Sequence, residues 1–243
     1  MRTLFVSDLH LSDERPDQLD LFRRFMSGPA LEAQALYILG DLIEVWAGDD
    51  DATAPHPWLI AIMRRFTDAG GRLFVMRGNR DFLMGERFCR ETGATLLPDP
   101  SVIELNDRRV LIMHGDLLCT QDTGYQRYRR LVHHPAFQKG FLAIPRFLRV
   151  GIAHGFRNLT RRTTRQKANT ITDVEQSTVE ATLREHGVSL LIHGHTHRPA
   201  VHDFDLDGQP ARRIVIGDWY EQDSVLVSDD QGERLVRVRE LLD

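Results

Sequence analysis

Short apolar runs alternate with amphipathic stretches along the first half of the chain. Apolar runs of this length are typical of buried strands, whereas apolar positions spaced three and four apart are typical of helices. The runs predict strands at 3–7, 35–39, 72–76, 102–105 and 109–113. The amphipathic stretches predict helices at 17–26, 57–69 and 85–92. Strands that alternate with helices in this way indicate βαβ units around a parallel sheet.

The last third of the chain changes to a strand-rich pattern. One more helix is predicted at 172–186, where Gly187 ends it, and a strand follows at 189–193. Short strands are then predicted at 199–205, 212–216, 223–228 and 234–239. Together the two halves predict an α/β fold in which two sheets pack as a sandwich.

Side chains able to bind metal follow the predicted strands directly. They lie in short, separate motifs: S-D-L-H, L-G-D, G-N-R-D, M-H-G-D and G-H-T-H. Open α/β sheets bind ligands at the carboxyl ends of their strands, so we expect these motifs to converge at one edge. The seven candidate ligands are Asp8, His10, Asp41, Asn79, His114, His195 and His197.

The donor types in this set indicate the kind of metal and the kind of reaction. Two carboxylates, one amide oxygen and four imidazoles suit divalent Mn, Fe, Co, Ni or Zn better than Ca or a purely oxygen-bound Mg. Seven donors are too many for one tetrahedral ion, but they match two ions that share a carboxylate. Two ions roughly 3.5–4 Å apart activate water and stabilise the attacking and leaving oxygens of a displacement at phosphorus. The set therefore predicts a two-metal hydrolytic site.

Length and composition are those of an ordinary globular protein. With 243 residues and 42% hydrophobic content, the chain can bury a sizeable core in one large domain, or in one domain with an insertion. We expect no signal peptide, and any membrane association is expected to be peripheral, because no apolar stretch approaches the roughly 20 residues of a spanning helix. Two cysteines, Cys89 and Cys119, are expected to be free thiols in a reducing compartment.

Residues 120–170 differ from the rest of the chain in charge and in the way apolar and cationic residues alternate. They hold eleven Lys or Arg and a single acid, Asp122, although the whole chain has a formal net charge of −4. Apolar side chains interleave with these cations, and Pro135 and Pro145 divide the segment into short helices. We expect a helical hairpin that forms a lid beside the strand ends. Its charge favours a phosphorylated substrate, nucleic acid or an anionic membrane as partner, and the alternative is a structural hairpin with a solvated charged face.

The order of the motifs adds information that no single motif carries. The series D-x-H, G-D, G-N-x-D, H-G-D and G-H-x-H resembles the calcineurin-like metallophosphoesterase family over about residues 1–217. This resemblance implies an αββα sandwich of two sheets. It also implies a single domain over 1–243 with a helical insertion at about 122–168, and hydrolysis of a phosphoric diester or diphosphate.

The same resemblance implies a role for each candidate ligand. It places Asp8, His10 and His197 on the first ion and Asn79, His114 and His195 on the second, with Asp41 bridging the two. Arg80 is expected to stabilise negative charge on the phosphoryl oxygens. The catalytic residues implied are Asp41, Asn79, Arg80 and His195. Asp81 and Asp116 are expected to accept hydrogen bonds from ligand imidazoles or to fix loops.

Longer stretches around the motifs narrow the resemblance to one family of enzymes. The segments 40–50, 114–123 and 192–202 are similar to the UDP-2,3-diacylglucosamine diphosphatases of lipid A biosynthesis. Members of that family release UMP and 2,3-diacylglucosamine 1-phosphate by attack of a metal-activated water on the α-phosphorus. The resemblance implies two divalent ions, with Mn²⁺ expected. It also implies a cytoplasmic enzyme bound peripherally to the anionic inner-membrane surface, with no nucleic acid partner.

Substrate contacts are implied by the same family pattern. They are Asn79, Arg80, Asp122, Thr160, Thr164, Lys167 and His195. Thr160 and Thr164 depart from the pattern, since the family has Ser and Asn at these positions. Two alternatives remain open at this stage: another metallophosphoesterase acting on a cyclic nucleotide or nucleic acid, and a metal-free interaction scaffold that has lost activity.

Overall fold

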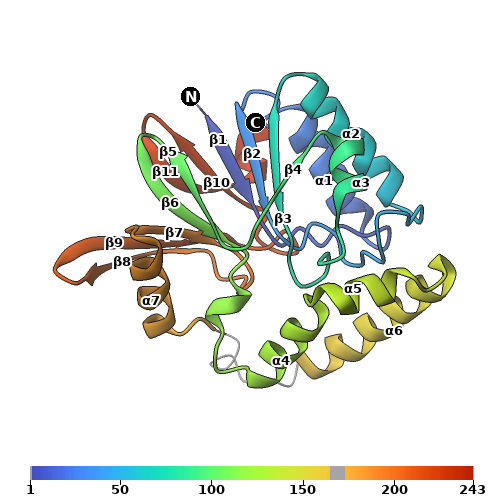
Figure 1. The fold of residues 1–243 in the computed structure, drawn as a ribbon. Coiled ribbons are helices and arrows are strands. Elements are labelled where there is room, and N and C mark those ends of the chain that lie inside the picture. Colours follow the sequence, from blue (N-terminus) through green and yellow to red (C-terminus); the bar gives the residue numbers. More distant parts are fainter. Residues whose placement is uncertain (1, 165–172, 243) are drawn as a thin grey trace.

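Two β-sheets pack face to face, and helices cover the outer side of each sheet (Figure 1). The computed structural model describes residues 2–164 and 173–242, with the backbone alone for 158–164. The predicted αββα sandwich is confirmed. The covering helices are α1 (Pro16–Ser27), α2 (His56–Asp68) and α3 (Glu86–Thr92) on the first sheet and α7 (Gln176–His186) on the second.

The first sheet has the strand order β11-β10-β1-β2-β3-β4. Its parallel core is made by the βαβ units of the first half of the chain, and two antiparallel strands from the C-terminal end extend it. The strands are β1 (Thr3–Val6), β2 (Ala35–Leu39), β3 (Arg72–Met76), β4 (Thr95–Leu97), β10 (Ser224–Asp229) and β11 (Gly232–Arg237). Segments far apart in the sequence therefore complete one sheet.

Alternation of side chains along β1 and β2 explains why this sheet is buried on both faces. Leu4 and Leu36 pack with the helices, whereas Phe5 and Tyr37 point toward the second sheet. Phe5, Tyr37 and Phe74 are cross-strand neighbours whose rings stack at 4.8 and 4.6 Å between centroids. This aromatic row joins three adjacent strands and stabilises their register.

The second sheet has the order β5-β6-β7-β9-β8. Its central strands β6, β7 and β9 are parallel, and the outer strands pair antiparallel to them. Val179 and Leu183 of α7 are fully buried against this sheet. The strands are β5 (Ser101–Leu105), β6 (Arg108–Met113), β7 (Leu190–His193), β8 (Ala200–Leu206) and β9 (Gln209–Val215).

Three helices lie across the carboxyl ends of the parallel strands (Figure 1). Pro135 begins one of them and Pro145 directly precedes another, in agreement with the predicted breaks. We call this segment the lid; it consists of α4 (Thr123–Val132), α5 (Pro135–Leu142) and α6 (Arg146–Thr164). The lid is therefore adjacent to the edge where the candidate ligands emerge.

Some elements differ from the prediction. The short strand β4 and the terminal helix α8 (Val238–Leu242) were not predicted, and neither was the 3₁₀ turn at Asp116–Leu118. Helix α7 begins at Gln176, later than the predicted start at 172. These elements are short or terminal, so they carry too few residues for a periodic pattern to be visible.

Candidate metal centre

Each candidate ligand follows the carboxyl end of a parallel strand. The loop after β1 continues to pair with the loop after β2, because the N–H of Asp8 donates to the carbonyl of Gly40 at 3.1 Å and that of His10 to the carbonyl of Asp41 at 2.9 Å. In the second sheet, His114 follows β6, and His195 and His197 follow β7. The N–H of Gly194 donates to the carbonyl of His114 at 2.9 Å, which ties these two loops together.

The backbone at these positions is unusual. Five of the seven candidate ligands have positive φ angles, a region that costs an L-residue about 1–2 kcal/mol. Such a conformation persists only where the surrounding structure enforces it, and it is frequent at functional sites. The five, with their φ angles, are Asp8 (54°), His10 (47°), Asp41 (52°), His195 (68°) and His197 (55°).

Two glycines allow the loops to approach this closely. A β-carbon at Gly78 would overlap the carboxylate of Asp41, and one at Gly194 would overlap both Ser7 and the carboxylate of Asp8. Only a residue without a side chain fits at these two positions. The glycines of the G-N-R-D and G-H-T-H motifs therefore let carboxylates from neighbouring loops lie against the backbone.

Asp8, His10 and His197 form the first cluster of donor atoms. One donor atom from each lies within 4.8 Å of the others. The Nε2 of His10 is 3.9 Å from Asp8 Oδ1 and 3.7 Å from Asp41 Oδ2, and the Nε2 of His197 is 3.2 Å from Asp8 Oδ1. Both ring nitrogens of His10 are buried and neither makes a hydrogen bond of ordinary geometry among the described residues, although Nδ1 lies 3.2 Å from Glu44 Oε2. A buried imidazole nitrogen facing two carboxylates without a hydrogen bond fits a metal ligand.

The second cluster gathers around His114. One donor atom each from Asp8, Asp41 and His114 lie within 4.8 Å of one another. The Nε2 of His114 is 3.0 Å from Asn79 Oδ1 and 3.2 Å from the Nδ1 of His195. On the other side of the ring, Nδ1 donates to the carbonyl of Leu39 at 2.9 Å, which leaves Nε2 as an acceptor in the neutral ring. In the neutral ring, the lone pairs of these atoms converge, and a bound cation would stabilise them, so this cluster also fits a metal ion.

Burial and neighbouring charges shift the pKa values of three imidazoles in the two clusters. Burial alone would lower the pKa of His114, but the charges of Asp41 and Asp8 outweigh it and raise the pKa to about 9. Burial likewise opposes the effect of Asp8 and Asp218 on His197, whose pKa is raised to about 10. Burial and the charge on His114 lower the pKa of His195 to about 4. The carboxylates thus favour a positive charge at the positions where metal ions are expected.

Two carboxylates outside the set of candidate ligands lie beside the far ring nitrogens of His10 and His197. Glu44 Oε2 lies 3.2 Å from the Nδ1 of His10, and Asp218 Oδ2 lies 3.4 Å from the Nδ1 of His197. A carboxylate on the far nitrogen commonly orients a histidine that binds metal with its other nitrogen. The sequence does contain a signal for Asp218. It follows β9 in V-I-G-D, just as Asp41 follows β2 in L-G-D.

Asp81 and Asp116 contact loops and helices, and no hydrogen bond to a ligand imidazole is present among their described contacts. Asp81 accepts hydrogen bonds from the backbone N–H groups of Leu42 and Gly78 at 2.8 and 2.7 Å. Burial and the nearby charge of Asp41 raise the pKa of Asp81 to about 6. Asp116 accepts hydrogen bonds from side chains of α4. Both carboxylates therefore act on loop position, one of the two roles expected for them.

A cavity of about 410 Å³ lies between the lid and the loop that carries Asn79 and Arg80. Asn79 and Arg80 line it at the end near the ligands, and the backbone N–H of Arg80 donates to Asp41 Oδ1 at 2.8 Å. Most of the remaining lining is aromatic or aliphatic, including Phe82, Phe141 and Ile152. The cavity therefore has a polar end beside the candidate ligands and an apolar remainder.

The other candidate substrate contacts are only partly described. Asp122 is half-buried at the start of α4, where its carboxylate accepts a hydrogen bond from the N–H of Tyr125 at 3.0 Å and caps the helix. Thr160 and Thr164 belong to the last turns of α6, where side chains lie outside the description, and Lys167 lies outside the described residues altogether.

Three arginines of the lid form ion pairs with acids of the main body. Arg129 donates to Asp116 at 2.7 Å and to Asp99 at 2.9 Å. Arg149, which is buried, donates to Asp50 Oδ2 at 2.5 Å and to the carbonyl of Ala47. Arg157 pairs with Glu44 and Glu14. Part of the positive charge of the lid therefore fastens it to the body.

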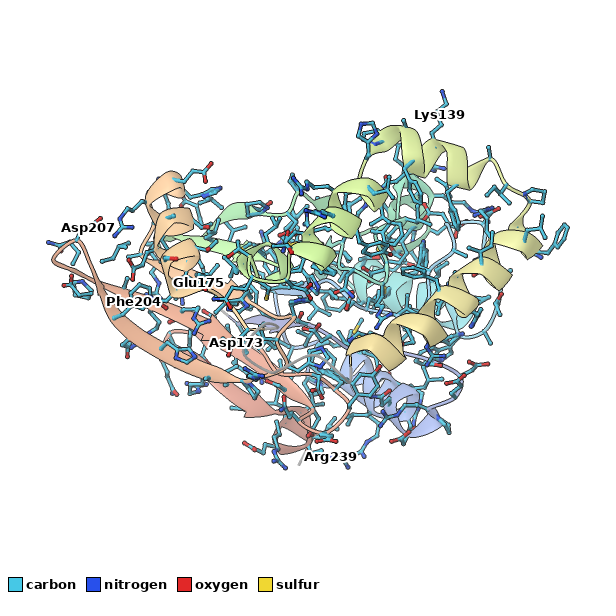
Figure 2. The ribbon with its side chains drawn as sticks, turned by 90° about the horizontal axis from the view of Figure 1, so that it is seen from below. Lys139, Asp173, Glu175, Phe204, Asp207 and Arg239 are labelled. Atoms are coloured by element: carbon cyan, nitrogen blue, oxygen red, sulfur yellow. The ribbon has the colours of Figure 1, made fainter. Side chains whose placement is uncertain are left out.

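Lys139 instead projects outward from α5, far from the hairpin that carries Phe204 and Asp207 (Figure 2).

Similarity to known proteins agrees with this geometry. Residues 1–199 match the calcineurin-like phosphoesterase family. The chain belongs to that family. Members are hydrolases that use divalent metals, and the Asp and His clusters of this chain fit such ions. Within the described residues, no helix combines the length and the apolar character needed to cross a membrane.

Individual relatives match nearly the whole chain. A UDP-2,3-diacylglucosamine hydrolase of Aeromonas salmonicida (strain A449) is 50% identical over 235 residues, which cover 97% of this chain and 92% of that protein. A protein of the same name from Pseudomonas aeruginosa PAO1 is 50% identical over 96% of this chain and 98% of its own length. The corresponding Escherichia coli O17:K52:H18 protein is 49% identical over 93% of this chain and 94% of its own.

Proposed function

We propose that this chain hydrolyses the diphosphate bond of UDP-2,3-diacylglucosamine in lipid A biosynthesis, releasing UMP and 2,3-diacylglucosamine 1-phosphate. The observation that carries this proposal is the position of the apolar cavity next to the Asp and His clusters, since Asn79 and Arg80 line the cavity and also contact His114 and Asp41. A diphosphate needs cations and hydrogen-bond donors, and two acyl chains need an apolar groove. The clusters and the cavity beside them offer these two environments, and three relatives at 49–50% identity carry the corresponding name.

The proposed site holds two divalent ions, Mn²⁺ by preference. Asp41 Oδ2 faces the first cluster and its Oδ1 faces the second, because the two oxygens lie 3.7 Å from the Nε2 of His10 and 4.0 Å from the Nε2 of His114. This orientation supports Asp41 as the bridging ligand. Asp8, His10 and His197 would hold one ion, and Asn79, His114 and His195 the other. Bound ions of this kind polarise phosphoryl oxygens and lower the pKa of water.

The residues of the chain orient the substrate and stabilise its charge. Arg80 lines the cavity, and its backbone N–H donates to Asp41 Oδ1 at 2.8 Å, which anchors the residue beside the candidate ligands. A fixed cation at this place stabilises the negative charge that develops on the phosphoryl oxygens. Asn79 and His195 would contact the same group, whereas Asp122, Thr160, Thr164 and Lys167 are proposed as contacts to the sugar and the phosphate.

One domain over 1–243 with an insertion at about 122–168 is part of the same proposal. Strands that follow the insertion complete both sheets, since β10 pairs with β1 and β7 pairs with β6. Neither part of the chain has a complete sheet without the other. The insertion therefore acts as a lid on one core and not as a linker between two.

Turnover of the lipid substrate tests the proposal directly. We expect purified protein with Mn²⁺ to release UMP from UDP-2,3-diacylglucosamine, and to leave a cyclic nucleotide and single-stranded DNA intact. Asp41→Ala and His195→Ala should abolish UMP release in folded protein. His202→Ala, which changes an exposed histidine of β8, serves as the control and should retain activity. Preference for the cyclic nucleotide or the DNA would assign the site to another phosphoesterase reaction.

The lid also supports peripheral binding to the cytoplasmic face of the inner membrane. Phe147 and Leu148 at the start of α6 are 73% and 47% exposed, and Arg146 and Lys139 are exposed close to them in the sequence. Apolar side chains flanked by cations are suited to an anionic lipid surface. We expect the protein to float with anionic liposomes and Phe147→Ser to float less. Equal flotation of both proteins would exclude this surface as the contact.

A further inference from the structure

Helix α6 is connected to the metal centre through a chain of two side-chain contacts. Arg157 donates from Nε to Glu44 Oε1 at 2.9 Å, and Glu44 Oε2 lies 3.2 Å from the Nδ1 of His10. The three side chains are only 11%, 9% and 5% exposed, so water screens these contacts poorly. An arginine of the lid thus reaches the far nitrogen of a candidate metal ligand through one carboxylate.

Glu44 is held from a second direction as well. The hydroxyl of Tyr220 donates to Glu44 Oε2 at 2.5 Å, and the ring of Tyr220 stacks on His10 with 5.0 Å between centroids. Burial acts to raise the pKa of Glu44, but the contact with His10 and the charge of Arg80 outweigh it and hold the pKa below its usual range. Glu44 is therefore a carboxylate whose direction depends on one donor from the lid and one from the main body.

The other lid arginines are arranged differently. Arg149 contacts Asp50 and backbone carbonyls, none of which touches a candidate ligand among the described contacts. Arg129 reaches Asp99, which accepts a hydrogen bond from the backbone N–H of His114 and not from its ring. Among these three, only Arg157 acts on the carboxylate that faces a ligand imidazole.

We propose that Arg157 is a positioning residue that couples the seating of α6 to metal binding at His10. By fixing Glu44, Arg157 holds the imidazole of His10 with Nε2 toward Asp8 and Asp41. Loss of such a supporting contact typically costs a metalloprotein about 10–100-fold in metal affinity. Coupling is reciprocal, so an ion bound at His10 also holds α6 more firmly against the body. This inference rests on the proposed metal centre.

Calorimetric titration with Mn²⁺ tests the first half of the coupling. Arg157→Met, which keeps the apolar stem, should weaken the binding of one of two ions about tenfold and leave the other unchanged. Tyr220→Phe removes the second donor to Glu44, keeps the ring, and should weaken the same ion. Glu14→Gln and Asp50→Asn remove the other acidic partners of Arg157 and Arg149, respectively, and should bind both ions as the wild type does.

The outcomes separate the coupling from the metal centre. A wild type that binds no Mn²⁺ would refute the metal centre itself, whereas tight binding of both ions by Arg157→Met would refute only the coupling. If Asp50→Asn weakened the ion as much as Arg157→Met, general loosening of the lid would explain the effect and the coupling would be rejected. Should Arg157→Met fail to fold, Arg157→Lys keeps the charge with fewer donors, and should show a smaller loss at the same ion.

Two further measurements distinguish positioning from contact with substrate, since Arg157 also lines the cavity. In Arg157→Met, excess Mn²⁺ should restore kcat, because the weakened ion is then replaced by mass action. A loss of kcat that excess Mn²⁺ does not restore would contradict the positioning role. Hydrogen exchange in α6 should slow on addition of Mn²⁺ to the wild type and remain unchanged in Arg157→Met. Equal slowing in both proteins would overturn the coupling.

Discussion

Metal binding should release protons, in a number that the geometry of the centre determines. His114 and His197 have pKa values of about 9 and 10, so both imidazoles are protonated at pH 7 when no ion is bound. His195, with a pKa of about 4, is already neutral. Metal ligands must be deprotonated, so two protons have to leave before His114 and His197 can bind an ion. His114 and His197 together are therefore expected to release about two protons when both ions bind at pH 7.

Calorimetry in buffers of different ionisation enthalpy measures this number. At pH 7, the observed enthalpy of Mn²⁺ binding in Tris and in PIPES should differ by about twice the difference between the buffers' ionisation enthalpies. His197→Gln should release one proton fewer. The combined binding constant should rise about 100-fold per pH unit between pH 6.5 and 8, since two protons compete with the ions. Identical enthalpies in the two buffers would refute the charge state derived for these imidazoles.

The same pKa values predict how the stability of the metal-free protein changes with pH. Both are raised above the ordinary imidazole value of about 6.5, so the folded state binds these protons more tightly than the unfolded state. Their stabilisation is complete below about pH 6.5 and is lost as the pH rises through about 9 to 10. The Tm of EDTA-treated protein should therefore fall between pH 7 and 10, and a Tm that rises over this interval would contradict the sign.

Three substitutions test other parts of the structure. Arg80→Ala should lower kcat/KM about 100-fold with unchanged Mn²⁺ affinity, because only the guanidinium is lost and the backbone contact to Asp41 remains. Weakened metal binding would contradict the view that the side chain acts on substrate and the backbone on Asp41. Ile152→Glu puts a charge into the apolar cavity and should raise KM for the diacyl substrate about tenfold but not for a short-chain analogue. Asp49 accepts three backbone N–H groups at the start of α3, so Asp49→Ala should lower the free energy of unfolding by about 2 kcal/mol in urea titration, with Asp49→Asn less affected.

The convergence of the candidate ligands was predictable because each motif directly follows a strand. Once Asp8, Asp41 and Asn79 are placed after parallel neighbours, the sheet itself brings them to one edge. Most strand boundaries were also predictable to within a few residues, since buried strands leave continuous apolar runs. The fold class follows from the same alternation of strands and helices, and the structure confirms it.

The partners of the lid arginines were not predictable from the sequence. An excess of positive charge in 120–170 indicates an anionic partner but not whether that partner lies outside or inside the molecule. The structure shows that Arg149 and Arg157 pair with acids about 100 residues or more away in the chain. No local pattern records a contact over such a separation. Glu44 was visible only as part of a motif, and its role depends on His10 and Arg157 meeting it in space.

The positive φ angles at five candidate ligands have a consequence for mutagenesis. Alanine is the usual substitution for removing a side chain, but at Asp8 or His197 it retains a β-carbon in a conformation that disfavours one. Glycine at the same position removes the ligand and relieves the backbone, so it should leave the protein about 1 kcal/mol more stable than alanine does. Loss of metal binding and loss of stability can thus be separated at a single residue by comparing the two substitutions. If deleting a ligand raises the free energy of unfolding, the increase measures how much stability the strained conformation of these loops costs.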